Sequence, residues 1–330
     1  MKDKALIIRG SKCFGDMIMI SFVPRQLKEK GYKRVLIASW KENKFVFDNN
    51  PYVDEVIPLE PLSDTEFFRQ VKEWSFDHDV FDFRFVIEKK FLQESISNRK
   101  SIDELISENY NKNYYRDSLK AYDLIGEKGD LYLSQDEKNR LNKYKDGKKR
   151  IAWQFTGSSR NKRLLYAFYY IKKIIEKLSN VEHWLFDDIT IPNIFEHKNI
   201  IDKRGELSPR KVLSLIPMFD LVVSPETFLV HVAGAFDIPT LTFYSHSSYE
   251  NLGKYFKNHY PVIPECDCYP CYTIIKDWKQ IYQLDNRENA RNKMISCLYA
   301  SEDMYRSIGF KCCTQINHEN VIKKIIEILE

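Results

Sequence analysis

Short apolar runs alternate with amphipathic segments along the first 90 residues of the chain. Residues 6–8 form an apolar run of strand length, and Ile20, Val23 and Leu27 then recur at helical spacing up to Gly31. The same reasoning applies to the segments that follow. We expect strands at 5–10, 34–40, 50–59 and 79–85. We expect helices after Asp16, in a short segment before 50–59, and at 67–74. This alternation predicts βαβ units and a parallel sheet. The polar, tyrosine-rich residues 91–140 are expected to form helices that cover it.

The alternation begins again after residues 142–150, a basic segment that contains glycine and no aliphatic side chain. We interpret that segment as a linker. Beyond it we expect strands at 150–157, 182–188, 220–225 and 239–244, with helices at 164–178, 208–219 and 227–236. Residues 318–330 predict a final helix with one apolar face, formed by Val321, Ile325, Ile326 and Leu329.

The two halves predict an α/β protein with two Rossmann-like parallel-sheet domains that face a cleft. A chain of 330 residues exceeds what one core usually holds, and two domains of about 150 residues are expected. We place the first domain at 1–145, the second at 150–315 and a closing helix at 316–330. The cleft between two such domains is the default ligand site.

Composition narrows the class of protein. The chain is 43% hydrophobic and 30% charged, which is typical of a globular protein and argues against disorder. Its net charge of +4 is spread along the chain, which argues against a dedicated DNA-binding domain but permits an anionic substrate. No apolar stretch approaches 18 residues, and the sequence enters a strand without a signal-peptide pattern. We therefore expect a cytoplasmic protein.

Asp16 is the first residue with candidate chemistry. It follows Gly15 between the first strand and an apolar helical segment, which places it at the carboxyl edge of the sheet, where α/β proteins bind ligands. A dinucleotide site would have several glycines here, and a carboxylate would repel a phosphate. Two interpretations remain: an acidic helix N-cap, or a general base at the cleft.

The segment 155–164 is the second candidate site. Gly157 permits close approach of a ligand to the backbone, Ser158 and Ser159 offer hydroxyl and amide groups, and Lys162 offers a cation at the start of the next helix. A cation at a helix N-terminus opposes the helix dipole and calls for a compensating anion. The segment is thus either a phosphate-binding loop or a plain solvated turn.

The segment 220–241 carries the third candidate site. Glu226 and Thr227 open a helix directly after a strand, and His231 follows one turn later. Glu226 could accept hydrogen bonds from sugar hydroxyls while the Thr227 amide points to the cleft. The alternative is an ordinary capped helix with His231 hydrogen-bonded in the core.

Six of the seven cysteines lie near the end of the chain, between residues 266 and 313. Cys268 and Cys271 have a chelating C-x-x-C spacing, and Cys297 and Cys312 could complete a tetrahedral thiolate site for zinc or iron. Cys266 and Cys313 are alternates. A cytoplasmic location would keep these residues as reduced thiols, so unligated buried thiols are the other interpretation.

Taken in order, these segments resemble the family 9 glycosyltransferases, the heptosyltransferase-like group with the GT-B fold. The matching pieces are "IIRGSKCFGDMI", "NPYVDEVIPL", "TGSSRNKRL", "GELSPRKVLSLIPMFDLVVSPETFLVHVAGAFDIPTL" and "CYPC". They span most of the chain in the order that the family has. The departures from the family pattern include Glu226 at the usual aspartate and Phe228 at the usual glycine, and the segment "FDDITIPNI" lacks the usual glycine-rich loop.

The resemblance implies a role for each matching residue. Asp16 would be the catalytic base, Lys162 the lysine that binds the donor diphosphate, and Leu207 would pack against the adenine. The remaining donor-binding residues implied are Thr156, Gly157, Ser158, Ser159, Asp188, Glu226, Thr227 and His231. A subgroup that heptosylates proteins has a four-cysteine metal site near its C-terminus, which the cysteines here resemble in type. Catalysis itself would need no metal.

The implied activity is inverting transfer of a sugar, heptose from ADP-heptose, to a hydroxyl of a bacterial surface glycan or its precursor. The expected partners are a nucleotide-sugar donor and a glycan acceptor, through which the protein could associate peripherally with a membrane. Alternative acceptors are a protein or modified phage DNA, and a non-catalytic nucleotide-sugar-binding protein is the alternative of a different class. The sequence indicates no particular oligomeric state.

Overall fold

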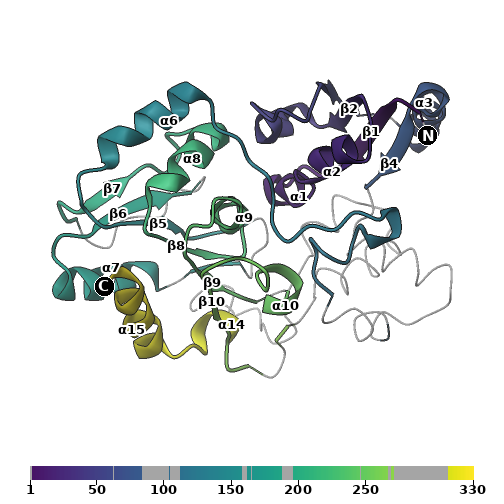
Figure 1. Ribbon diagram of the computed structural model, residues 1–330. Helices are drawn as coiled ribbons and strands as arrows, with labels where there is room; N and C mark the ends of the chain where they lie inside the picture. The colour runs from purple at the N-terminus through teal and green to yellow at the C-terminus, as the bar shows by residue number, and fades with distance from the viewer. Residues whose placement is uncertain are drawn as a thin grey trace.

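The computed structural model describes residues 2–61, 63–83, 104, 112–157, 162–164, 166–187, 196–245, 247–266, 269–270 and 311–330. It contains two parallel β-sheets, each flanked by helices, in two lobes that lie side by side (Figure 1). The predicted α/β fold with two parallel-sheet domains is confirmed.

The first sheet has four strands in the order β3-β2-β1-β4: β1 (Lys4–Arg9), β2 (Arg34–Ser39), β3 (Glu55–Pro58) and β4 (Asp79–Asp82). All neighbouring pairs are parallel, as predicted. The strands are apolar on both faces because helices cover both. Ile7 packs on the side of α1 (Phe14–Met19) and α2 (Val23–Glu29), whereas Leu6 and Ile8 pack on the side of α3 (Asp64–Asp77).

The prediction of a single helix after Asp16 is wrong. Two short helices replace it, with a break at residues 20–22, and α1 begins at Phe14, before Asp16. Pro24 lies in the first turn of α2, where its missing N–H has no intrahelical partner to lose. Gly31 has φ of 97° and follows the end of α2, so its predicted role as a terminator is confirmed.

The helices expected over the first sheet at 91–140 are only partly tested, because residues 91–103 and 105–111 lie outside the described residues; Glu104 is helical. Residues 112–134 contain only the short 3-10 helix η2 (Lys120–Tyr122). The helix α6 (Gln135–Leu141) packs instead against α8 (Pro209–Leu215) of the second sheet, where Glu137 pairs with Arg210. The 3-10 helix η3 (Asn142–Tyr144) follows in the segment predicted as the linker, and η1 (Lys41–Phe47) is the short helix expected before β3.

The second sheet has six parallel strands in the order β10-β9-β8-β5-β6-β7. They are β5 (Arg150–Gln154), β6 (Glu182–Phe186), β7 (Ile200–Asp202), β8 (Leu221–Pro225), β9 (Thr240–Phe243) and β10 (His259–Val262). The pattern of apolar residues predicts four of them but misses β7 and β10. Those two are short edge strands whose residues are only partly buried or exposed.

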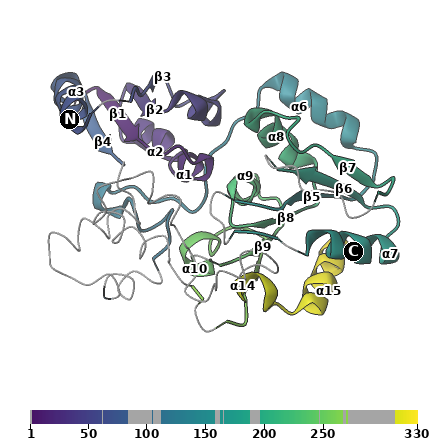
Figure 2. The same ribbon diagram turned by 180° about the vertical axis from the view of Figure 1, so that it is seen from behind.

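Helices lie on both faces of the second sheet (Figures 1 and 2). They are α7 (Ala167–Lys177), α8, η4 (Ile216–Met218), α9 (Phe228–Ala235), α10 (Tyr249–Leu252), α14 (Lys311–Thr314) and α15 (His318–Leu329). The final helix α15 packs against α7. Its buried face consists of Val321, Ile322, Ile325 and Leu329, so Ile322 takes the fully buried position that we assign to Ile326.

One cluster of buried apolar side chains includes residues from both sheets and so extends across both domains. Its buried members include Ile18 and Phe22 of the first domain, Tyr115 of residues 112–134, which we call the connecting segment, and Val232 and Phe256 of the second domain. A second cluster fills the space between the sheet and α7 and α15. The two domains thus share a continuous interior at the place where α1 meets α9.

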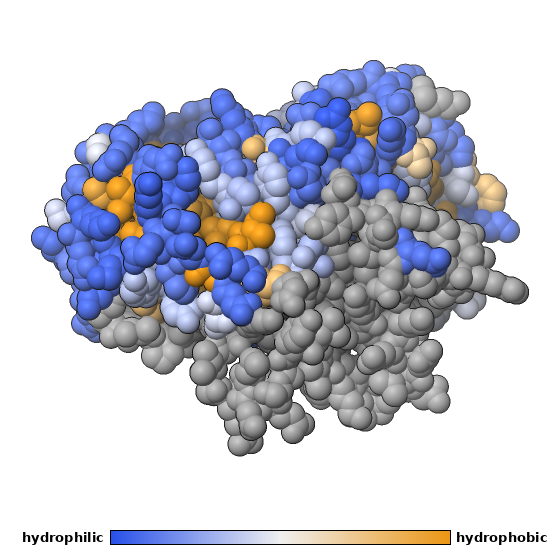
Figure 3. Space-filling view, turned by 90° about the horizontal axis from the view of Figure 1, so that it is seen from below, coloured by the Kyte–Doolittle hydropathy of each residue, from blue (hydrophilic) through white to orange (hydrophobic). Residues whose placement is uncertain are grey.

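On the face seen from below, the described residues are mostly polar (Figure 3). Seen from below, hydrophobic side chains gather mainly on the side of the second domain, within an otherwise hydrophilic face (Figure 3). Among the helices of the described ranges, none combines the length and the apolar character that a membrane crossing requires.

Candidate active site

Asp16 lies in the first turn of α1, close to the second domain. Its Oδ2 atom accepts hydrogen bonds from Arg9 Nη2 at 2.9 Å and from Ser11 Oγ at 2.5 Å, and its side chain is 35% exposed. The N-cap residue of α1 is Cys13, and no side chain caps the helix. The N-cap interpretation of Asp16 is therefore wrong, and its carboxylate is a partly accessible acceptor.

Gly15 allows α1 to approach α9. A Cβ atom at this position would lie 2.8 Å from Cδ2 and 3.0 Å from Nε2 of His231. On the other side of its ring, His231 Nδ1 shares a hydrogen bond of 2.7 Å with the Tyr115 hydroxyl. His231 is thus held between the first helix of one domain and a residue of the connecting segment.

The same packing perturbs the ionisation of both hydrogen-bonded residues. Burial, together with the smaller effect of the nearby Lys162 charge, lowers the pKa of His231 to about 3. Burial also raises the pKa of Tyr115, to which the Asp16 charge contributes. Both groups are therefore neutral near pH 7. The interpretation of His231 as a hydrogen-bonded core residue is confirmed, with Tyr115 as the partner that sequence reasoning missed.

Lys162 and Glu226 form an ion pair close enough to His231 for the Lys162 charge to affect its ionisation. Lys162 Nζ lies 3.1 Å from Glu226 Oε1, and the Glu226 side chain is almost fully buried. Ser247 donates to the same carboxylate through its hydroxyl, at 2.9 Å, and through its backbone N–H, at 3.4 Å. Glu226 therefore contacts Lys162 and Ser247, whereas we expected it to be available for sugar hydroxyls.

We expected Lys162 at the start of a helix, but that prediction is wrong, because α7 begins only at Ala167. Thr156 and Arg163 instead form an antiparallel bridge, and the Gly157 N–H donates to the Lys162 carbonyl. A Cβ atom on Gly157 would lie 2.8 Å from Lys162 Cβ and 2.9 Å from Thr227 Cγ2. Glycine is thus needed where this loop passes the start of α9. Ser158 and Ser159 lie outside the described residues.

Thr227 is the N-cap residue of α9, but its side chain does not cap the helix. Its hydroxyl donates to Gln154 Oε1 at 2.6 Å and shares a hydrogen bond of 2.7 Å with Ser224 Oγ. A helix N-terminus without a side-chain cap keeps its positive end available to an anion. This end lies beside Lys162, so the two features together are suited to a phosphate group.

Asp187 is a site residue that sequence reasoning missed. Its carboxylate accepts from the backbone N–H groups of Phe155 and Thr156 at 3.1 and 2.9 Å, and from Thr156 Oγ1 at 2.7 Å. It thereby fixes the start of the loop that leads to Lys162, and it engages the Thr156 hydroxyl that we assign to the donor. The adjacent Asp188, our predicted residue, lies outside the described residues. Leu207 lies between β7 and α8, partly buried against the core, and its contact with adenine stays a prediction.

Three phenylalanines join the two domains beside this site. The rings of Phe14 and Phe45 lie 5.0 Å apart, and that of Phe228 lies 5.6 and 6.1 Å from them, all edge to face. Arg210 reinforces the junction, because it pairs with Glu137 and donates to the Phe45 carbonyl. Phe228, where the family pattern has glycine, thus fills space between the domains.

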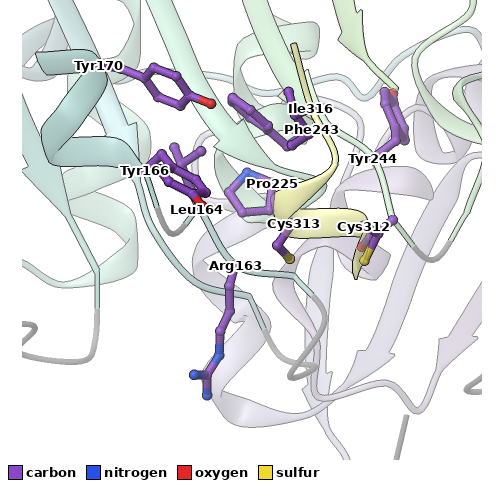
Figure 4. Close-up of a pocket in the computed structure, with 11 residues that line it drawn as sticks. Arg163, Leu164, Tyr166, Tyr170, Pro225, Phe243, Tyr244, Cys312, Cys313 and Ile316 are labelled. Atoms are coloured by element: carbon purple, nitrogen blue, oxygen red, sulfur yellow. The ribbon is translucent and has the colours of Figure 1, made fainter. Parts of the chain in front are cut away.

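The predicted metal site lies mostly beyond the described part of the chain, which leaves out Cys268, Cys271 and Cys297. Cys312 is buried in α14 and lines a small cavity together with Cys313. The side chain of Arg163, which also borders this cavity, extends away from the other lining residues (Figure 4). In the described ranges, no group of three or more His, Cys, Asp or Glu side chains could hold a metal ion. The four-thiolate site stays a prediction.

Comparison with known proteins gives the fold. Neither a family model nor a curated protein matches this sequence. Solved structures do match. A glycosyltransferase of family 9 from Veillonella parvula has a TM-score of 0.60 at 12% identity, covering 88% of this chain and 96% of the other.

Two Escherichia coli proteins are similar in the same way. The ADP-heptose lipopolysaccharide heptosyltransferase II has a TM-score of 0.56 at 15% identity over 84% of this chain and 98% of its own. The iron-containing dodecameric glycosyltransferase TibC has a TM-score of 0.64 at 12% identity over 99% of this chain and 76% of its own. The predicted GT-B fold and the resemblance to family 9 are thus confirmed at the level of structure.

Proposed function

We propose that this GT-B protein is an inverting glycosyltransferase that moves a sugar from a nucleotide diphosphate to an acceptor hydroxyl. The observation that carries the proposal is the division of chemistry across the domain interface. Asp16 offers a partly exposed carboxylate on the first domain. Lys162 and the start of α9 offer positive charge on the second.

In the proposed reaction, Asp16 takes the proton of the acceptor hydroxyl as that oxygen attacks the anomeric carbon. The bond from that carbon to the diphosphate breaks, and the electron pair leaves with the nucleotide. Lys162 and the N-terminal amides of α9 stabilise the charge that develops on the leaving group. The attack occurs on the face opposite the leaving group, so the anomeric configuration inverts.

We propose ADP-heptose as the donor and a bacterial surface glycan or its precursor as the acceptor. Support comes from heptosyltransferase II, which is named for ADP-heptose, and from the match of Leu207 to the adenine position of the family pattern. Glu226 in place of the family aspartate carries its carboxylate one methylene further, and it reaches Lys162. The contacts of the donor sugar would then differ in detail from those of the family.

We also propose a structural metal held by Cys268, Cys271, Cys297 and Cys312. The Glu265 N–H donates to the Gln315 carbonyl, which brings the start of the cysteine-rich segment beside the end of α14. TibC is described as iron-containing. Thiolates at these positions would join distant loops and contribute folding energy.

The test of the proposed function begins with binding of ADP, GDP and UDP by calorimetry and release of the nucleotide from a panel of sugar donors. Asp16→Asn should lower the transfer or hydrolysis rate about 10²–10⁴-fold and leave the affinity for ADP unchanged, because the carboxylate serves the acceptor. Asp130→Asn, which removes a carboxylate paired with Arg25 in the same domain, is the matched control. A wild-type protein that binds no nucleotide, or an Asp16→Asn variant with full activity, would contradict the proposal.

A further inference from the structure

The two oxygens of the Asp16 carboxylate have different surroundings. Oδ2 accepts from both Arg9 and Ser11, at 2.9 and 2.5 Å. Within the described ranges, no hydrogen bond reaches Oδ1. One oxygen therefore anchors the group, and the other is left for a ligand.

Arg9 is fixed from two directions. It is the last residue of β1, which lies between β2 and β4, and its side chain is only 6% exposed. Its Nη1 atom donates to the Phe83 carbonyl at 2.6 Å, directly after β4, and its Nη2 atom donates to Asp16. The guanidinium thus connects the end of one strand to the first turn of α1 in a single rigid plane.

The burial of the Arg9 guanidinium has a free-energy cost that a purely structural contact would not explain. Arg9 Nε is buried and has no hydrogen-bond partner in the part of the chain that the structure describes. Only Arg9 of this ion pair is buried, and the cost of removing its charge from water offsets much of the attraction to the partly exposed Asp16. The retained cation is better explained by its effect on the carboxylate than by its contribution to folding.

Orientation is the property that these bonds can supply. The last torsion of an aspartate side chain is broad and has no sharply preferred value, so an unanchored carboxylate rotates readily. Ser11 is itself held, because its Oγ accepts from the Cys13 N–H at 3.1 Å. Two donors that converge on Oδ2 fix the rotation and the direction of Oδ1.

We propose that Arg9 and Ser11 are positioning residues that hold Asp16 with Oδ1 facing the acceptor hydroxyl. This inference rests on the proposed function. The proton of the acceptor moves to Oδ1 while its oxygen bonds to the anomeric carbon, and the nucleotide diphosphate leaves with the electron pair. Oδ2 stays bonded to Arg9 and Ser11 throughout, and Asp16 later returns the proton to solvent.

The kinetic test uses release of ADP from ADP-heptose by Ser11→Ala, Arg9→Lys and Arg9→Met, each made also in the Asp16→Asn background. We expect kcat to fall about tenfold for Ser11→Ala and about 10²-fold for Arg9→Met, with Arg9→Lys between wild type and Arg9→Met. The KM for ADP-heptose and the affinity for ADP should stay within twofold. In the Asp16→Asn background the same substitutions should have no further effect, because the group that they position is gone.

A matched control separates positioning from folding. Arg25→Met removes an arginine–aspartate pair with Asp130 in the same domain and should leave kcat unchanged. Equal losses of kcat with and without Asp16, or no loss in Ser11→Ala and Arg9→Lys, would overturn the inference.

A second measurement does not depend on the sugar. Crystal structures of Ser11→Ala and Arg9→Lys should show the Asp16 carboxylate rotated or in two conformations, and a single unchanged orientation in both would also overturn the inference. A wild-type protein that releases nucleotide from no donor would instead contradict the proposed function, and the orientation of Asp16 would still decide the positioning role.

Discussion

Gly15 to alanine is the substitution whose effect the geometry specifies most closely. The new Cβ atom would lie 2.8 Å from His231 Cδ2, whereas ordinary contact begins at 3.4 Å, so the two atoms must separate by 3.4 − 2.8 = 0.6 Å. His231 has little room to move, because it is buried and its Nδ1 is bonded to Tyr115. The displacement must therefore fall on α1, which carries Asp16 as the next residue.

The magnitude follows from two opposing effects. Overpacking a filled interior costs about 1–3 kcal/mol. Replacing glycine by alanine within a helix returns about 1 kcal/mol. The net loss in the free energy of unfolding is then at most about 2 kcal/mol. A shift of Asp16 by more than half an ångström should reduce kcat more severely, by up to about 10²-fold.

The assay combines urea unfolding with nucleotide release from the donor that the wild-type protein uses. The double variant Gly15→Ala with His231→Ala is the control, since it removes the ring that the new methyl group meets. Its effect should be smaller than the sum of the two single effects. Strict additivity, or a Gly15→Ala variant with unchanged stability and kcat, would refute the reasoning.

Three further predictions concern charge, pH and metal. Lys162→Ala should raise the Kd for ADP at least tenfold, as measured by calorimetry, and should slow the chemical step. Glu226→Gln should tighten ADP binding, because it removes the anion that pairs with the Lys162 ammonium group. Unchanged affinities in both variants would mean that the donor binds at another site. Burial lowers the pKa of His183 and His231 to about 3 and that of His259 to about 4, below the usual histidine value of 6.5. The free energy of unfolding should therefore be constant above about pH 6.5 and should fall by up to about 1.4 kcal/mol per pH unit for each histidine as the pH drops toward 4. A urea-unfolding profile that does not change with pH would contradict this prediction. Elemental analysis of protein purified without added metal should find a nearly filled four-thiolate site, and less than about 0.2 equivalents of zinc plus iron would leave the cysteines as ordinary thiols.

The strands that form the centres of both sheets could be predicted from sequence because they are continuous apolar runs. β1 and β5 are buried on both faces, and burial of that kind leaves a direct pattern in the chain. The break between α1 and α2 could not be predicted in the same way. Ile20, Val23 and Leu27 are all buried, so their spacing is compatible with one helix although the backbone turns between them.

The candidate site divides along similar lines. Asp16 directly follows Gly15, and Lys162 lies a few residues after Gly157, each shortly after a predicted strand, and such positions can be recognised from local sequence. The hydrogen bond between Tyr115 and His231 joins residues 116 positions apart, and only the packing of the two domains brings them together. Asp187 and its neighbour Asp188 are chemically identical, so the sequence gives no basis for assigning to Asp187 the hydrogen bonds that it makes with Phe155 and Thr156.

The apolar core that passes from α1 and α2 through Tyr115 to α9 governs how the protein unfolds. Because Phe22, Tyr115 and Phe256 belong to one buried cluster, separating the lobes would expose part of the interior of each to water. The backbone reinforces this connection, since the Tyr114 N–H donates to the Asn251 carbonyl and Asn251 Nδ2 donates to the Lys112 carbonyl. The two lobes should therefore melt in a single cooperative transition, and a fragment cut at residues 142–150 would carry an exposed apolar face prone to aggregation.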